Sequence, residues 1–595
     1  MTKPPSPTSH DLPASGASDG AETIGPAPRL ALVLPRETGG TPARREKPPW
    51  LMISDEGIPA GCDYVYAPDN VDWRLGGHAL SNALLSLCTL DLDFVIVSSS
   101  LTEPPAIEIN SVRNNVIFSR RAFHGLRTQG HLPAGSRGRV LRILPGPRDA
   151  WAIRLADPNH LEIGTMRIQG ADLHVPEDKS RYSRPPSTWN EPPHFRSPGD
   201  SRRRVLVLPI FMAVGGAERN LIQLLKALKD RFAFFVATTE PVALERGSLN
   251  HEAIQHCEHL FDLGEIASPA EHMNLIDVLA KAIEPDLVFI ANGSPWLAAH
   301  AERLRRRFSD IPIVDQQVYD AREGWIQHFD NPGIRSADRF IAINREIAGA
   351  LETRWAIDSD RIDLIYHAVD TECFNLDRRN KIDTKKTWAR LGFGGPPPSE
   401  REEAAPRHVF GQVARLTTQK RPRDFLELAQ RSAATGSRDL FLLIGDGELS
   451  ADCDDFIDQH GLENVKRLPF CDDMSELYPI LSGLIFTSAY EGLPVALLEA
   501  LCMGVPVLST AVGDIRPILD EFGTGQTVEA GASMEELFDA FTSWRDDLAW
   551  LQESARRAAP LVMERFNGTA VGARYARSWE RAWKPLAPYR KTKAT

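Results

Sequence analysis

Short apolar runs alternate with amphipathic stretches along the chain from about residue 203 to residue 585. This alternation is typical of βαβ units, whose strands lie parallel in one sheet that helices cover. The predicted strands of the first half cover residues 204–209, 232–238, 286–291, 311–315, 339–343 and 362–366. Those of the second half cover residues 409–415, 440–445, 465–468, 483–487 and 505–509. The sequence therefore predicts an α/β protein with two doubly wound, Rossmann-like lobes.

Stretches rich in proline and polar residues divide the chain further. Residues 1–45 carry few aromatic side chains and cannot bury enough apolar surface to offset the entropy of ordering, so we predict a disordered tail. Residues 177–201 have the composition of a linker, and residues 391–407 that of a hinge or a surface insertion. The remaining units are an N-terminal module of unassigned function, a first lobe and a second lobe, at residues 46–176, 202–390 and 408–585.

Charge and cysteine usage exclude several classes of protein. The net charge of −12 argues against nucleic-acid binding, which requires an excess of lysine and arginine. The seven cysteines are never spaced as CxxC, and no apolar run approaches the roughly 18–20 residues that span a bilayer. We therefore expect a cytoplasmic protein. A cluster of arginines leaves open a peripheral contact with the inner face of a membrane, although a solvated helix face explains it more simply: Arg303, Arg305, Arg306 and Arg307.

The densest motif joins two predicted strands of the second half. Pro494 suits the first turn of a helix, so we predict a helix from about residue 494 to residue 503. The backbone N–H groups of Gly492 and Leu493 would then point into the crevice at the carboxyl edge of the sheet, where they can bind phosphate. Glu491 lies in the loop and Glu499 roughly 7 Å further along the helix axis. One carboxylate can meet a sugar and the other a ribose, although a first-turn acid and an exposed helical glutamate fit the same spacing.

Two cations flank the loop after the predicted strand at residues 409–415. Arg415 closes the strand and Lys420 precedes the next helix. Arginine offers a bidentate fork and lysine a point charge, so the two can converge on one diphosphate. Two solvated surface charges are the alternative.

A pair of glycines follows the first strand of the first half. Gly215 and Gly216 permit close approach of the backbone before an amphipathic helix begins. They can cradle a donor phosphate or an acceptor, or form a plain turn. Their spacing does not fit GxGxxG, so a dinucleotide cofactor is not indicated.

The stretch from Glu491 to Glu499, EGLPVALLE, with GVPVLST after it, resembles the Glu-x7-Glu signature of family-4 retaining glycosyltransferases. The resemblance implies the GT-B fold, with two Rossmann-like lobes and a cleft between them. It also implies that Glu499 binds the ribose of a nucleotide-sugar donor. Glu491 would lie near the sugar or its reacting face.

The other two motifs resemble the same family. The resemblance implies that Arg415 and Lys420 clamp the diphosphate and that Gly215 and Gly216 form the first-lobe glycine loop. Ala414 stands where the family usually has glycine. Two further departures concern the segment YHAVD, in which His367 and Ala368 replace the usual pair, and the strand at residues 311–315, after which the family often has histidine. Here the polar candidates are Gln316, Gln317, Tyr319 and Asp320.

The resemblance covers about residues 203–585. It implies transfer of a sugar from a nucleotide-diphosphate sugar to a hydroxyl of a glycan, polysaccharide or lipid-linked saccharide, with retention of configuration. The donor is a substrate, and no permanently bound cofactor is expected. Asp91 and Asp93 form an isolated DxD, a pattern too common by chance to assign a metal. A noncatalytic nucleotide-sugar-binding or glycan-assembly protein and a GT-B epimerase remain alternatives, which release of nucleotide and an acceptor-free assay would separate.

Overall fold

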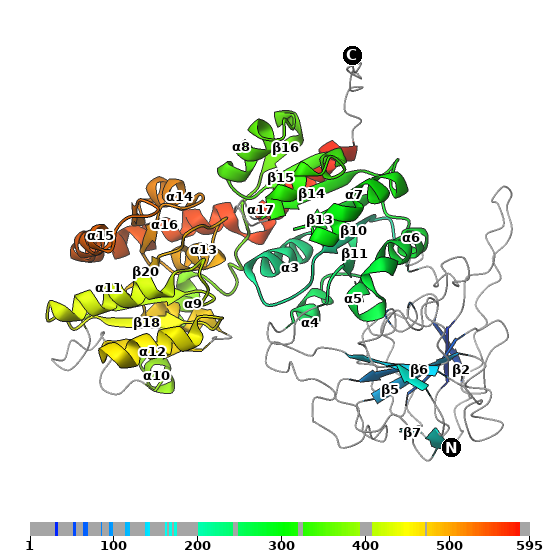
Figure 1. Cartoon of the computed structure of the whole chain (residues 1–595), viewed down its shortest axis with the longest axis horizontal. Coiled ribbons are helices and arrows are strands. Elements are labelled where there is room, and N and C mark those ends of the chain that lie inside the picture. Colours follow the sequence, from blue (N-terminus) through cyan, green and yellow to red (C-terminus); the bar gives the residue numbers. More distant parts are fainter. Residues whose placement is uncertain are drawn as a thin grey trace, which may run out of the picture.

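The computed structural model describes residues 200–241, 248–318, 325–392, 407–469 and 473–583. It also describes nine short strands between Leu30 and His174 and three single residues, Asn82, Leu85 and Phe195. Two lobes lie side by side, and the sheet formed by the N-terminal strands lies next to the first of them (Figure 1).

The first lobe is built on a seven-stranded sheet in which every pair of neighbours is parallel, with the order β12-β11-β10-β13-β14-β15-β16. The strands are β10 (Arg203–Pro209), β11 (Phe232–Thr238), β12 (His259–Asp262), β13 (Leu287–Ala291), β14 (Ile313–Gln317), β15 (Arg339–Ala342) and β16 (Ile362–Leu364). The main helices are α3 (Gly216–Leu228), α6 (His272–Ile283), α7 (Pro295–Arg307) and α8 (Arg345–Thr353). All six predicted strands are present, and β12 is an addition.

The second lobe repeats this plan with a six-stranded parallel sheet of order β19-β18-β17-β20-β21-β22. Its strands are β17 (Val409–Val413), β18 (Leu440–Ile444), β19 (Val465–Leu468), β20 (Gly483–Phe486), β21 (Val507–Thr510) and β22 (Gly525–Val528). Its helices include α11 (Pro422–Ala434), α12 (Ser450–His460), α13 (Val495–Cys502), α14 (Ile515–Phe522), α15 (Met534–Asp546) and α16 (Leu548–Phe566). The prediction of two doubly wound lobes is confirmed.

The N-terminal strands form a mixed sheet of order β2-β1-β3-β5-β4-β6-β9, with a separate β7-β8 pair. The bounds are β1 (Leu30–Val33), β2 (Leu51–Ser54), β3 (Tyr64–Pro68), β4 (Phe94–Ser98), β5 (Asn114–Ser119), β6 (Arg137–Arg142), β7 (Leu161–Ile163), β8 (Met166–Ile168) and β9 (Asp172–His174). Because β1 pairs with both β2 and β3, it belongs to this sheet and not to the tail predicted for residues 1–45.

The N-terminal part of the chain contacts the first lobe through an amide. Asn82 donates from Nδ2 to the Leu260 carbonyl at 2.6 Å and accepts at Oδ1 from the Asp262 N–H at 2.8 Å. Both partners lie on β12, at the edge of the first-lobe sheet. Leu85 and Phe195 are buried in the core of the same lobe. The predicted module is therefore anchored to the first lobe.

The chain crosses between the lobes at two adjoining segments. Residues directly after β16 pack in different cores: Ile365 and Ala368 belong to the first-lobe core, whereas Tyr366 and Val369 belong to that of the second lobe. The Val369 N–H donates to the Phe566 carbonyl at 2.9 Å, at the end of α16. Because Tyr366 and Val369 already pack in the core of the second lobe, the boundary predicted at residue 390 lies too late in the chain.

The last helix, α17 (Gly568–Trp583), returns to the first lobe although its sequence falls within the predicted second lobe. Trp579 is fully buried and contacts the rings of Phe232, Phe234 and Phe289, all on first-lobe strands. The terminal helix is therefore anchored on the first lobe and does not fill the core of the second.

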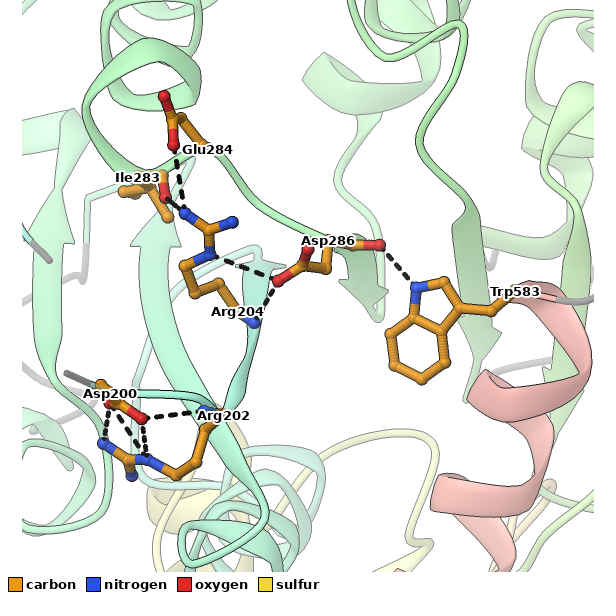
Figure 2. Close-up of polar contacts among 7 residues, drawn as sticks. All are labelled: Asp200, Arg202, Arg204, Ile283, Glu284, Asp286 and Trp583. Atoms are coloured by element: carbon orange, nitrogen blue, oxygen red, sulfur yellow. Dashed lines mark hydrogen bonds and ion pairs between the residues drawn. The ribbon is translucent and has the colours of Figure 1, made fainter. Parts of the chain in front are cut away.

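Figure 2 shows how the end of α17 is fixed to the first lobe. The Trp583 indole N–H donates to the Asp286 carbonyl at 2.7 Å. The carboxylate of the same aspartate accepts from the Arg204 backbone N–H at 2.8 Å, and Arg204 also donates to the Ile283 carbonyl at 3.1 Å. One short loop before β13 thus joins β10, α6 and α17.

We expect Trp579→Ala to lower the free energy of unfolding by about 3–5 kcal/mol, since it removes a fully buried indole and leaves a cavity. Urea unfolding followed by circular dichroism measures the change. Trp550→Ala is the matched control, because that side chain on α16 is 61% exposed and its loss should have little effect. Equal effects of the two substitutions would contradict this placement of α17.

A buried carboxyl group lies in β14. Asp315 is 3% exposed and lines a cavity of about 30 Å³, room for a water molecule, together with Ser294, Gln317 and His328. Gln317 donates from Nε2 to Asp315 Oδ1 at 2.5 Å, whereas its own Oε1 has no hydrogen-bond partner among the described residues. Burial raises the pKa of Asp315 to about 7, and the Gln317 hydrogen bond opposes this only in part.

The raised pKa of Asp315 predicts that stability falls with rising pH. Between the unfolded pKa of about 4 and the folded pKa of about 7, the native state binds the extra proton, so the contribution present at low pH is lost as pH rises through 7. Asp315→Asn should remove up to about 1.4 kcal/mol per pH unit from this slope. Urea unfolding between pH 5 and 8 tests this, and parallel pH profiles for parent and variant would contradict it.

Candidate active site

The predicted acidic motif occupies the loop from β20 to α13. Pro494 takes the N-cap position, so the helix begins at Val495, one residue after the predicted start. Because β17 and β20 are paired and parallel, the loops that follow them meet at the carboxyl edge of the sheet. The Ala489 N–H donates to the Gln419 carbonyl at 2.8 Å, which joins the two loops directly.

Lys420 and Glu491 form an ion pair at this junction, although 71 residues separate them in the chain. Lys420 Nζ lies 2.6 Å from Glu491 Oε1 and 2.7 Å from Oε2. Ser488 donates its hydroxyl to Glu491 Oε1 at 2.6 Å. The lysine side chain is 16% exposed and the glutamate 5%. Both charges are therefore fixed in position and largely removed from water.

Arg415 lies in the same loop as Lys420 but differs in its surroundings. Its side chain is exposed and makes no hydrogen bond or ion pair with any residue that the structure describes. The backbone around it is shaped by two glycines. A Cβ on Gly445, whose φ is +129°, would lie 2.0 Å from the Ala414 carbonyl oxygen, and one on Gly447 would lie 2.4 Å from that of Leu416. These glycines allow the neighbouring turn to pack against the cationic loop.

Glu499 lies on α13 and is half-buried. Tyr478 donates its hydroxyl to Glu499 Oε2 at 2.8 Å, so the other carboxylate oxygen remains available to a ligand. Burial raises the pKa of Glu499, opposed by the Tyr478 hydrogen bond and the charge of Arg219, while Asp370 adds to the rise. Arg219 and Asp370 belong to the first lobe and to the crossing segment, so Glu499 faces the gap between the lobes.

The first-lobe glycine loop meets the start of α13. Gly216 is the first residue of α3, and a Cβ there would lie 3.3 Å from the Val495 side chain. Gly215 is the N-cap of α3, and a Cβ there would lie 2.3 Å from Glu218 Oε2. The two motifs that were predicted in different lobes are therefore brought together.

Gly492 lies where the second lobe packs on the first. A Cβ at this position would lie 2.6 Å from the Val318 carbonyl oxygen and 2.7 Å from Ile343 Cδ1. The Gly492 carbonyl accepts from Asn344 Nδ2 at 3.2 Å. The contacts of this glycine are thus with the first lobe, and its binding of phosphate stays a prediction.

The next residue, Leu493, is buried beside His367 of the crossing segment. Burial lowers the pKa of His367 to about 4, opposed by the Leu493 backbone, so this imidazole is neutral at neutral pH. The altered YHAVD segment therefore places a neutral ring against the loop between β20 and α13.

The polar candidates at the end of β14 and directly after it divide into three groups. Gln316 donates to the Tyr575 hydroxyl at 2.8 Å and so faces α17, away from the gap. Gln317 lines the small cavity beside Asp315. Tyr319 and Asp320 lie outside the described residues.

The sequence did not reveal two contributors to the site. Tyr478 lies in a short 3-10 segment with no spacing that marks it, and Asn344 is the N-cap of α8. Arg219 is a further contributor. It directly follows Gly-Gly-Ala-Glu on the first turn of α3, and this position next to the glycine loop is the sequence signal that could have indicated it.

Within the described ranges, no helix is long and apolar enough to cross a membrane. Nor do these ranges hold a group of three or more histidine, cysteine, aspartate or glutamate side chains that could bind a metal ion. Asp91 and Asp93 lie outside them.

Two family models match the two lobes. The model described as "Glycosyl transferases group 1" matches residues 399–559, which contain the Lys420–Glu491 pair and Glu499. The model described as "Glycosyltransferase Family 4" matches residues 214–373, from the glycine loop to the crossing segment.

Individual proteins give the same result. Alpha-D-kanosaminyltransferase of Streptomyces kanamyceticus is 22% identical over 304 residues, which are 50% of this chain and 71% of that protein. The putative glycosyltransferase EpsF of Bacillus subtilis is 24% identical over 331 residues, 52% of this chain and 79% of that protein. The crystal structure of Anabaena HepE with UDP and glucose aligns with a TM-score of 0.51 at 18% identity, over 64% of this chain and all of HepE. Through its two GT-B lobes, the chain belongs to the group 1 and family 4 glycosyltransferases.

Proposed function

We propose that the chain transfers a sugar from a nucleotide-diphosphate sugar to an acceptor hydroxyl with retention of configuration. The observation that carries this proposal is the Lys420–Glu491 ion pair at the meeting point of the loops after β17 and β20. Because both oxygens of Glu491 lie close to Nζ, the cation is held at one point beside the start of α13. A fixed cation stabilises the charge that develops on a departing nucleoside diphosphate.

Arg415 would supply the second charge on the diphosphate. It has no partner among the described residues, and its guanidinium can bind two phosphate oxygens at once. The backbone N–H groups of Gly492 and Leu493 and those of Gly215 and Gly216 would complete the phosphate contacts from the two lobes.

Glu499 would bind the ribose of the donor. Its Oε2 accepts from Tyr478, which fixes the rotamer and leaves Oε1 for a ribose hydroxyl. The charge of Arg219 on the opposite lobe favours the ionised form that accepts such a hydrogen bond.

Retention requires either a covalent intermediate or attack from the side of the leaving group. The carboxylate assigned to the sugar, Glu491, is held by Lys420 and Ser488 and is poorly placed to act as a nucleophile. We infer attack by the acceptor hydroxyl on the face that the phosphate leaves, with a phosphate oxygen taking the proton. The protein would contribute orientation and stabilisation of the leaving group.

The first test is release of nucleotide. The likeness to HepE, solved with UDP and glucose, makes uridine-diphosphate sugars the first donors to try, followed by guanosine and adenosine donors. The acceptor would be a glycan, a polysaccharide or a lipid-linked saccharide. Transfer predicts nucleotide release that depends on acceptor, whereas a noncatalytic binding protein would bind the donor without releasing nucleotide.

We expect Glu499→Gln to weaken binding of the preferred donor by roughly 10- to 150-fold, because a hydrogen bond to a charged group is worth about 1.5–3 kcal/mol. Calorimetric titration of donor measures the change. Glu463→Gln, at an exposed side chain between α12 and β19, is the matched control. Donor affinity equal to that of the parent would remove Glu499 from the site.

We expect Lys420→Met to lower kcat by about 10²–10³-fold through loss of leaving-group stabilisation. That variant also leaves Glu491 buried without its cation, so Lys420→Met/Glu491→Gln separates the two effects by replacing both charges with neutral side chains of similar length. The double variant should regain the melting temperature of the parent and stay inactive. If it regains activity, the pair is structural and the proposed role of Lys420 is wrong.

A further inference from the structure

A second group of cations lies at the edge of the first lobe, away from the loops after β17 and β20 that hold the proposed donor site. The groove has a volume of about 530 Å³ and lies between β16 and α17. This size is within the range of small-molecule sites. The residues that line the groove include none from the loops after β17 and β20. Because β16 is the last strand of the sheet, the groove opens on the outer side of the lobe.

Three arginines of α17 reach this groove: Arg574, Arg577 and Arg581. Residues three, four and seven positions apart share one face of a helix, so the three guanidinium groups form a row along it. The opposite face of α17, which carries Tyr575 and Trp579, packs in the first-lobe core. The helix therefore presents arginine to the groove and aromatic rings to the sheet.

The two acidic residues of the groove are already engaged. Asp363 is buried and accepts from Arg339 Nε at 2.9 Å, from the Ser578 hydroxyl at 2.6 Å and from Arg581. Glu580 forms its ion pair with Arg231, outside the groove. Neither carboxylate is left to neutralise the remaining arginines.

Arg574 and Arg577 have no hydrogen-bond or ion-pair partner in the part of the chain that the structure describes. Arg577 is exposed, whereas Arg574 is half-buried. Burial lowers the pKa of Arg574, as do the charges of Arg565 and Arg577, and Tyr366 opposes this only in part. Two like charges held together and partly desolvated raise the free energy of the native state, and a bound anion would relieve this cost.

We propose that the groove between β16 and α17 binds a phosphate group, held by Arg574 and Arg577. Guanidinium groups bind phosphate oxygens bidentately, and two of them side by side match the geometry of one phosphate or of two joined phosphates. The phosphate can belong to a soluble small molecule or to a lipid headgroup. This site is independent of the proposed donor site, because Arg415 and Lys420 lie in the other lobe.

The test uses the full chain, with inorganic phosphate as the soluble probe and vesicles of phosphatidylcholine and phosphatidylglycerol in equal parts as the lipid probe. Melting temperature and calorimetry at low salt report on phosphate, and co-sedimentation reports on vesicles. We expect Arg574→Gln/Arg577→Gln to weaken binding at least about tenfold. Lys420→Met/Glu491→Gln, which removes the cleft charges, should retain the binding.

Arg431→Gln is the matched control, since Arg431 on α11 is exposed and likewise has no partner among the described residues. Loss in the α17 variant alone supports the proposal, and the probe affected identifies the source of the phosphate. Arg577→Gln, at an exposed side chain, should weaken binding in the same direction without disturbing packing. The proposal is overturned if the parent binds neither probe, or if the α17 and control variants bind as the parent does.

Discussion

The candidate site forms only where the carboxyl edges of the two lobe sheets lie close together. Glycine residues, which have no side chain, make this close approach possible. Gly492 lies against Val318 and Ile343 of the first lobe, and Gly216 lies against Val495 of the second. A side chain at Gly492 would meet a carbonyl oxygen, which cannot move aside as a flexible side chain can. The separation of the lobes, and with it the distance from Arg219 to Glu499, depends on these two positions.

The segments that cross between the lobes also set how far apart the lobes lie. Residues 365–369 contribute side chains to both cores. The end of α16 is joined to this segment by a hydrogen bond from the Val369 N–H to the Phe566 carbonyl. Helix α17 then anchors the chain on the first lobe through Trp579 and Trp583. Any change in the angle between the lobes must therefore be absorbed by Asn567, between α16 and α17, and by the residues after β16.

Much of the architecture could be predicted from sequence because parallel strands are buried on both faces and read as apolar runs. The lobe strands that escaped prediction, β12 and β22, are edge strands of four residues, HLFD and GQTV, in which polar residues interrupt the pattern. The placement of Trp579 could not be predicted, since an apolar helix face does not indicate which of two cores it will join. The boundary at residue 390 was wrong for a related reason, because the chain crosses between the lobes directly after β16 and not at the proline-rich stretch that suggested a boundary.

The candidate site, too, could be predicted only in part from the sequence. Local motifs predicted roles for Glu491, Glu499, Arg415 and Lys420, and the structure places Lys420 against Glu491. The partners that orient them come from distant parts of the chain. Tyr478 reaches Glu499 from a separate short helix, and Asn344 reaches Gly492 from the other lobe. Such contacts depend on tertiary packing and leave no trace in spacing.

The amide of Asn82 has a consequence for how molecules of this protein meet. The outer polar groups of a terminal strand can pair with a strand from another molecule, and β12 is such a strand. Asn82 takes up the Leu260 carbonyl and the Asp262 N–H. With those groups occupied from within the same chain, they are not available to pair with a strand of a second molecule.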